Sequence, residues 1–315
     1  MSSSGNKKNN RVSFLMVLGL LTLPMLQLGC ATEAASYSNP QEAEAALVSA
    51  LRSGEPQQLK TVFGSKVDSL VNTSDPVSMR NNIERFVEAY DRQHKLVEQP
   101  DKSMSLLVGS EEWPFPIPLR QTARGWEFDT EAGRDEIINR RIGHNEISAV
   151  EVCRAIVDAE LDYVGSDPNH DGIPEYAGKF LSDPGQKDGL YWPTKEGEAP
   201  SPLGSLLAGA AEEGYTFKRS ATPQPYHGYE YRILKSQGSS APEGALNYVI
   251  GGRMIGGFAV VAYPAEYGSS GVMTFLVGRD GIVYQKDLGD GTARLARAMQ
   301  SYDPDSSWQK VEPAK

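Results

Sequence analysis

The sequence lacks several features that mark common classes of protein. It contains only two cysteines, Cys30 and Cys153, so we expect no intrachain disulfide. No apolar run after residue 29 is long enough to span a bilayer. Its 31 Lys and Arg stand against 41 Asp and Glu, a formal net charge of −10, and so acidic a chain cannot neutralise a row of phosphates. We therefore expect no nucleic-acid partner.

Motifs of two large enzyme classes are also missing. Gly-x-Ser-x-Gly does not occur, which argues against a serine hydrolase. The glycine-rich stretch 251–257 leads into a predicted strand rather than a helix, so it lacks the context of a phosphate-binding loop. With 39% hydrophobic residues, the chain can still bury a core. The sequence thus leaves enzymatic activity uncertain and favours its absence.

The chain begins with the pattern of a secretory signal peptide, residues 1–29. A basic start precedes an apolar run over residues 12–23, and Leu28-Gly29-Cys30 follows. These last residues resemble the lipobox of bacterial lipoproteins, which implies that Cys30 carries a lipid. Ala31 resembles the outer-membrane class of such proteins. We expect a lipoprotein on the periplasmic face of the outer membrane, with a soluble periplasmic protein as the alternative.

The rest of the chain is predicted to form a tether over residues 30–39 and two α+β domains. The first domain is expected over residues 40–143 and the second over residues 144–315, since 315 residues suit two domains better than one.

The first domain is predicted to combine helices with an antiparallel sheet. Helices are expected over residues 40–52 and 76–94, and strands over residues 103–108 and 125–129. The proline-broken stretch 113–119 suits a sheet edge or an extended segment. This order of elements resembles the cone-shaped nuclear-transport-factor-like fold. The cone in that fold often holds a ligand or a catalytic acid, but no His/Asp pair is obvious here, which favours a structural cone.

The second domain is predicted to pack a long helix on an antiparallel meander. The helix is expected over residues 145–164, with Asn145 as its cap and Glu146 favouring the helix dipole. Cys153 lies on its apolar stripe, which predicts a buried small side chain rather than a nucleophile. A short helix is expected near 203–213. Strands are expected over residues 229–234, 245–250, 257–263, 272–277 and 282–286, the last two joined by a hairpin turn at Asp280-Gly281.

Two resemblances follow from these segments. The helix over 149–160 and the strands over 257–268 and 271–277 resemble the globular head of type IV pilins and pseudopilins. The apolar N-terminal extension of a pilin helix is absent, so we do not expect polymerisation. Five motifs stand out across the chain: Trp113–Leu119, Arg141–Glu146, Asp188–Pro193, Pro225–Tyr229 and Arg253–Phe258. On these motifs, residues 40–308 resemble the bacterial family called domain of unknown function 2950, which implies no established activity.

The sharpest local motif alternates oxygen-bearing side chains. Asp167, Asn169 and Asp171 are followed by Gly172, as in the first half of an EF-hand loop. The twelfth position is a glycine, so Glu175 would have to complete the shell. These residues favour a solvated Asx-turn loop; the alternative is a structural Ca²⁺ bound by Asp167, Asn169, Asp171 and Glu175.

A second candidate site is aromatic. Core packing is the favoured interpretation of Tyr191, Trp192, Tyr226, His227 and Tyr229; the alternative is a platform for a sugar or a peptide.

These observations favour a lipid-tethered envelope protein that acts as a binding or assembly module. Its expected partners are an envelope protein or a cell-wall component, and the membrane through the lipid anchor. The alternative is an envelope hydrolase of cell-wall or saccharide material, with paired carboxylates such as Glu266, Asp188 or Glu175 as acid and base.

Overall fold

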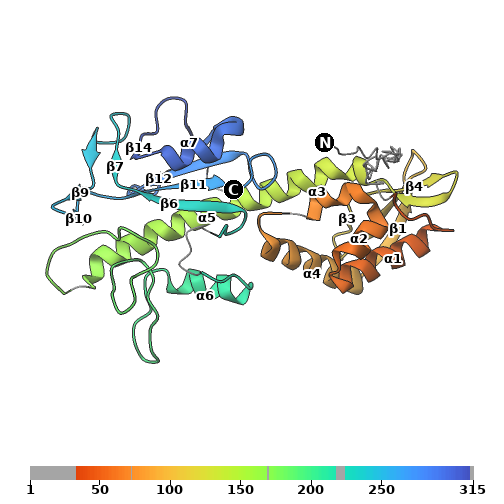
Figure 1. The fold of residues 1–315 in the computed structure, drawn as a ribbon, viewed down its shortest axis with the longest axis horizontal. Helices are drawn as coiled ribbons and strands as arrows, with labels where there is room; N and C mark the ends of the chain where they lie inside the picture. Colours follow the sequence, from red (N-terminus) through yellow and green to blue (C-terminus); the bar gives the residue numbers. More distant parts are fainter. Residues whose placement is uncertain (1–32, 72, 169, 218–223, 313–315) are drawn as a thin grey trace, which may run out of the picture. The chain divides into compact units, whose positions relative to one another are not determined.

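The computed structural model describes residues 33–71, 73–168, 170–217 and 224–312 (Figure 1). Thr32–Lys315 form one compact unit. The chain has α-helices and antiparallel sheets in separate segments, which confirms the predicted α+β class. Within the described ranges, no helix combines the length and the apolar character that crossing a membrane requires.

The helices and strands have the following bounds. The helices are α1 (Pro40–Ser53), α2 (Pro56–Phe63), α3 (Asp68–Val71), α4 (Pro76–Arg92), α5 (Thr130–Ser166), α6 (Gly204–Glu212) and α7 (Thr292–Ala298), with 3₁₀ turns η1 (Ser65–Val67) and η2 (Gly289–Gly291). The strands are β1 (His94–Glu98), β2 (Met104–Val108), β3 (Trp113–Pro114), β4 (Leu119–Thr122), β5 (Gly125–Phe128), β6 (Tyr229–Leu234), β7 (Ser236–Gln237), β8 (Leu246–Asn247), β9 (Val249–Ile250), β10 (Arg253–Met254), β11 (Ala259–Pro264), β12 (Met273–Gly278), β13 (Val283–Asp287), β14 (Ser301–Tyr302) and β15 (Gln309–Lys310).

Polar side chains start the two helices that the sequence predicts in the first half. Asn39 Oδ1 accepts a hydrogen bond from Glu42 N at 2.9 Å at the start of α1. Asp75 Oδ1 accepts one from Ser78 N at 3.0 Å at the start of α4. Each side chain satisfies a backbone N–H that has no partner within its helix, and a proline follows each cap. Both predicted helices are confirmed.

The first sheet has the strand order β1-β2-β4-β5, and β3 pairs with β2. All of its pairings are antiparallel. Of the proline-rich stretch 113–119, Trp113 and Pro114 form β3 and Leu119 begins β4, whereas the segment between them, with Pro116 and Pro118, lies outside the strands because proline cannot donate a ladder hydrogen bond. Leu47 of α1, Phe63 of α2 and Phe128 of β5 belong to the core of this half.

Helix α5 differs from the prediction. It begins at Thr130, where Asp129 Oδ1 accepts a hydrogen bond from Ala132 N at 3.1 Å, so the predicted start and cap at Asn145 are wrong. A glycine inside a helix costs only about 1 kcal/mol, which a helix of 37 residues tolerates at Gly143. Asn145 and Glu146 therefore lie within the helix.

The predicted division into two domains stays a prediction. Helix α5 runs across the boundary expected between residues 143 and 144. The buried residues form two hydrophobic clusters, one between Ala43 and Phe128 and the other between Ala149 and Tyr302, so each cluster lies on one side of that boundary.

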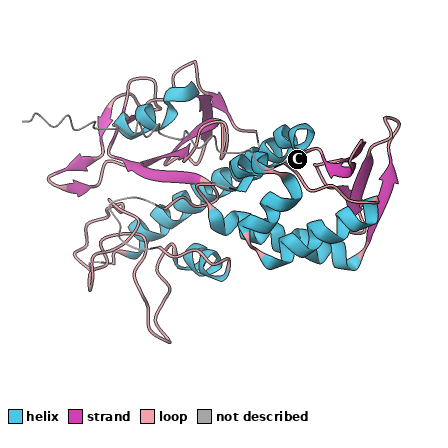
Figure 2. Ribbon diagram, turned by 45° about the vertical axis from the view of Figure 1, so that its right-hand side comes forward, coloured by secondary structure: helices cyan, strands magenta, loops and turns pink. Residues whose placement is uncertain are grey.

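The second sheet has the strand order β15-β13-β12-β11-β6 and is antiparallel throughout. It lies between α5 and α7 in both ribbon views (Figures 1 and 2). On the α7 side, Arg232 Nη2 donates to Ala296 O at 2.7 Å, and Arg297 forms an ion pair with Glu230 at 3.0 Å. The hairpin turn predicted at Asp280-Gly281 joins β12 to β13 and is confirmed.

Cys153 of α5 is fully buried in the second core. Burial raises the pKa of its thiol to about 12, so the thiol is protonated at neutral pH. The predicted packing role of Cys153 is confirmed. The lipid-bearing candidate Cys30 lies outside the described residues.

Candidate functional site

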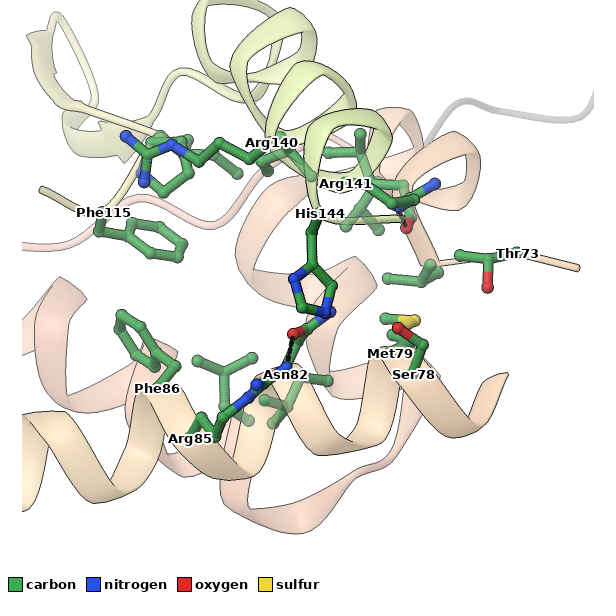
Figure 3. A pocket seen from close by; sticks show the side chains of 18 of the residues that line it. Thr73, Ser78, Met79, Asn82, Arg85, Phe86, Phe115, Arg140, Arg141 and His144 are labelled. Carbon is green, nitrogen blue, oxygen red and sulfur yellow. Dashed lines mark hydrogen bonds between the residues drawn. The ribbon is translucent and has the colours of Figure 1, made fainter. Parts of the chain in front are cut away.

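A cavity of about 630 Å³ lies between α4 and α5 (Figure 3). Its volume falls within the range of small-molecule binding sites. Most of the side chains that line it are apolar, and they come from α2, α3, α4 and α5 and from the segment that follows β3. Such a cavity favours a ligand with a large apolar surface.

The facing helices each contribute one face to the cavity. Helix α4 supplies Met79, Ile83 and Phe86, and α5 supplies Ile137 and His144, with Arg140 and Arg141 between them. These positions recur at three- and four-residue intervals, so they lie along one side of each helix.

Aromatic rings form one end of the cavity. The ring centroids of Phe86 and Phe115 are 5.2 Å apart, and those of Phe63 and Phe115 are 6.3 Å apart. Figure 3 shows Phe86 and Phe115 on the opposite side of the view from Arg141 and Thr73. The cavity therefore has an aromatic end and a polar end.

The charged groups that line the cavity are mainly cationic. Arg140 forms an ion pair with Glu136 at 2.6 Å and donates to Pro114 O. Arg85 Nη2 donates to the neutral Asn82 Oδ1 at 2.6 Å. Arg141 donates to Leu70 O at 2.6 Å and to Ser269 Oγ at 3.4 Å. In the part of the chain that the structure describes, neither Arg85 nor Arg141 forms an ion pair.

Desolvation affects two of these groups. Arg141 is half-buried, and burial lowers the pKa of its guanidinium, which nevertheless stays protonated as every arginine does. Burial, assisted by the nearby charge of Arg85, lowers the pKa of His144, so its imidazole is neutral at pH 7. Figure 3 shows the His144 ring directed from α5 toward Asn82 and Arg85 of α4.

Asp75 is the one carboxylate among the described residues that line the cavity. It is buried, and its oxygens accept hydrogen bonds from neutral donors. Beyond its capping bond at Ser78 N, Oδ2 accepts from Tyr215 Oη at 2.8 Å and from Gly228 N at 2.9 Å. Asp75 thus joins the start of α4 to the segment before β6 rather than pairing with a cavity arginine.

Two residues of α5 hold the helix against the second sheet. Asn145 Nδ2 donates to Ser270 O at 2.9 Å. Glu146 Oε1 accepts hydrogen bonds from Val272 N at 2.9 Å and from Met273 N at 3.0 Å. These bonds replace the capping roles that the sequence predicted for the same side chains.

The predicted aromatic residues divide into two groups. Tyr226 and His227 lie together, with ring centroids 4.1 Å apart, whereas Tyr229 is fully buried and packs on Phe275. Trp192 packs against Tyr163, and Tyr191 bridges to Leu181. Tyr226 also lines a second cavity of about 190 Å³. The sugar or peptide platform stays a prediction.

The predicted calcium loop has other partners for two of its carboxylates. Asp171 and Glu175 both accept hydrogen bonds from the Arg253 guanidinium, at 2.7 and 2.9 Å. Asp167 Oδ2 accepts from Gly172 N at 2.9 Å, and Asn169 lies outside the described residues. The calcium site stays a prediction.

The carboxylates named for a hydrolase are engaged in different contacts. Glu175 pairs with Arg253, and Asp188 forms an ion pair with Lys179 at 2.6 Å. Glu266 interacts electrostatically with Arg141.

Sequence reasoning missed the cavity because it began α5 fifteen residues too late. The signal was present: Asp129 is a good cap, and Ile137, Arg140, Arg141 and His144 follow at helical spacing. Only the fold places this stripe opposite α4.

Comparison with known proteins gives a family but no characterised relative. Searches of curated proteins and of solved structures found no match. The profile of the family described as "Protein of unknown function (DUF2950)" matches residues 34–311. Because this match covers most of its length, the chain belongs to the DUF2950 family.

Proposed function

We propose that this protein binds a ligand with a large apolar part in the cavity between α4 and α5. The observation that carries the proposal is a cavity of about 630 Å³ whose walls are mostly apolar. Burying apolar ligand surface against such walls contributes roughly 25 cal/mol per Å² before the entropic cost of binding is subtracted. This arrangement supports a role in binding.

The proposal places this binding protein in the bacterial cell envelope. The basic start, the short apolar run and Leu28-Gly29-Cys30 support export and a lipid anchor at Cys30, on the periplasmic face of the outer membrane. The pilin-head resemblance of the second half belongs to the same proposal: the segment that leads into β12, together with Met273 at its start, supplies the bonds to Asn145 and Glu146 that hold one wall of the cavity.

The test uses N-phenylnaphthylamine, an uncharged dye whose fluorescence increases in apolar surroundings. The chain is purified as an exported Cys30→Ser form, so that no lipid is attached. We expect saturable binding by the unaltered cavity. Ile83→Trp should weaken the dye affinity at least about tenfold, because the larger ring occupies cavity volume.

Glu84→Trp is the matched control, since it adds the same ring at the next position of α4, where the side chain is exposed and does not line the cavity. It should leave the affinity unchanged. Circular dichroism melting checks that both variants are folded. Equal dye binding by folded Ile83→Trp and Glu84→Trp would mean that the dye binds outside the cavity, and this would contradict the proposal.

A further inference from the structure

The charges that line the cavity do not balance. Three arginines face one carboxylate, and that carboxylate, Asp75, is bonded to neutral donors. Arg140 has its partner in Glu136, on the same helix. Two guanidinium groups, those of Arg85 and Arg141, remain without an ion pair among the described residues.

The charge of Arg141 is energetically unfavourable in the protein without a ligand. The Arg141 side chain is half-buried, and a charge withdrawn from water loses hydration that its neutral acceptors and the electrostatic interaction with Glu266, which is not an ion pair, replace only in part. Its fork has five N–H donors, of which Leu70 O and Ser269 Oγ engage two. An anion at this position would restore the missing interaction and gain charge-assisted hydrogen bonds.

The position of these arginines relative to the aromatic rings indicates how a ligand would be oriented in the cavity. Arg141 lies on the opposite side of the close view from the rings of Phe86 and Phe115, and the side chain of Arg85, which is next to Phe86 on α4, reaches Asn82 below the His144 ring (Figure 3). A ligand that fills the cavity would therefore have an apolar body at the aromatic end and a polar group near Arg85, His144 and Arg141.

We propose that the ligand is a single-chain acidic amphiphile, with its apolar tail against the aromatic end and its carboxylate or phosphate head bound by Arg85 and Arg141. This inference rests on the proposed function, since it names the class of ligand for the same cavity. Both heads present oxygens that match the planar fork of arginine, and either one neutralises the two unpaired charges.

The experiment is displacement of N-phenylnaphthylamine from the Cys30→Ser form at about pH 8, where a carboxylic acid is ionised. The competitors are dodecanoate, dodecyl phosphate and dodecanol, which share one tail and differ in the head. We expect at least one acidic competitor to bind about tenfold or more tightly than dodecanol. Preference for the phosphate indicates a lipid phosphate head, and preference for the carboxylate indicates a free fatty acid.

Arg85→Gln and Arg141→Gln should each lower the ratio of the acidic competitor's affinity to the affinity of dodecanol. Arg80→Gln is the control, because Arg80 is an exposed arginine of α4 outside the cavity lining. Arg85→Gln keeps the test informative if Arg141→Gln fails to fold, since Arg85 is exposed. Equal binding of all three competitors, or a preference that survives both variants, overturns the inference and leaves the proposed function intact. Absence of dye binding by the unaltered cavity overturns both.

Discussion

Glu160 carries a carboxyl group in surroundings very different from water. It lies on α5, fully buried, where Oε2 accepts a hydrogen bond from Ala177 N at 2.8 Å and Oε1 has no partner among the described atoms. Burial raises its pKa from 4.5 to about 8, although the bond from Ala177 opposes the shift. The folded protein therefore holds this carboxyl protonated at neutral pH.

This shift predicts a pH dependence of stability. Between pH 4.5 and about 8 the folded state binds a proton that the unfolded state has released, so the free energy of unfolding falls as pH rises. One proton corresponds to roughly 1 kcal/mol per pH unit at the steepest point. Glu160→Gln should flatten the dependence in urea unfolding between pH 5 and 8.

Asp158→Asn provides the comparison, since Asp158 is exposed on the same helix. It should leave the pH profile as it is. A profile of Glu160→Gln that keeps the original slope would assign the pH dependence to another group.

At the scale of an element, α5 contains two glycines in opposite surroundings. A Cβ built on Gly133 would lie 2.6 Å from Ile117 Cγ1 and 2.7 Å from both Ile117 Cα and Pro116 O, so the backbone of the neighbouring segment would have to move. A Cβ built on Gly143 meets nothing within 4 Å. Gly133 therefore allows a neighbouring segment to pack closely on α5, whereas no such contact depends on Gly143.

The pair predicts effects of opposite sign. Gly133→Ala should lower the free energy of unfolding by about 2 kcal/mol through overpacking. Gly143→Ala should raise it by about 0.5–1 kcal/mol, because alanine favours the helix and restricts the unfolded chain. Both are measured by urea unfolding, and a loss of stability in Gly143→Ala would contradict the uninterrupted helix through residues 143–145.

At the scale of the whole molecule, the proposed lipid anchor decides where the protein is found. We expect radiolabelled palmitate to be incorporated into the unaltered chain and not into Cys30→Ser. Acyl chains hold a protein at a membrane by burying apolar surface in the bilayer, so the unaltered chain should sediment with outer membranes and Cys30→Ser should appear in the periplasmic fraction. Cys153→Ser is the control, because that thiol is buried and does not acquire lipid. Equal labelling of all three forms would contradict lipid attachment at Cys30.

Much of the fold could be predicted because its signals are local. Asn39 and Asp75 start their helices through hydrogen bonds that span three residues, and Asp280-Gly281 closes its hairpin within a few residues. The α+β class follows from such patterns. The start of α5 was missed because Gly143 and Asn145 imitate a helix boundary, and continuous packing outweighs that local preference.

The sequence by itself determined the α+β class, most helix and strand positions, the burial of Cys153 and the family, since each depends on patterns of residues that are neighbours in the chain. Only the tertiary structure decided that α4 and α5 face each other across a cavity and that Arg85 and Arg141 both line it. These two arginines are far apart in sequence, and no periodicity encodes the distance between them. Their meeting depends on the way both helices pack on their cores, which is a property of the whole fold.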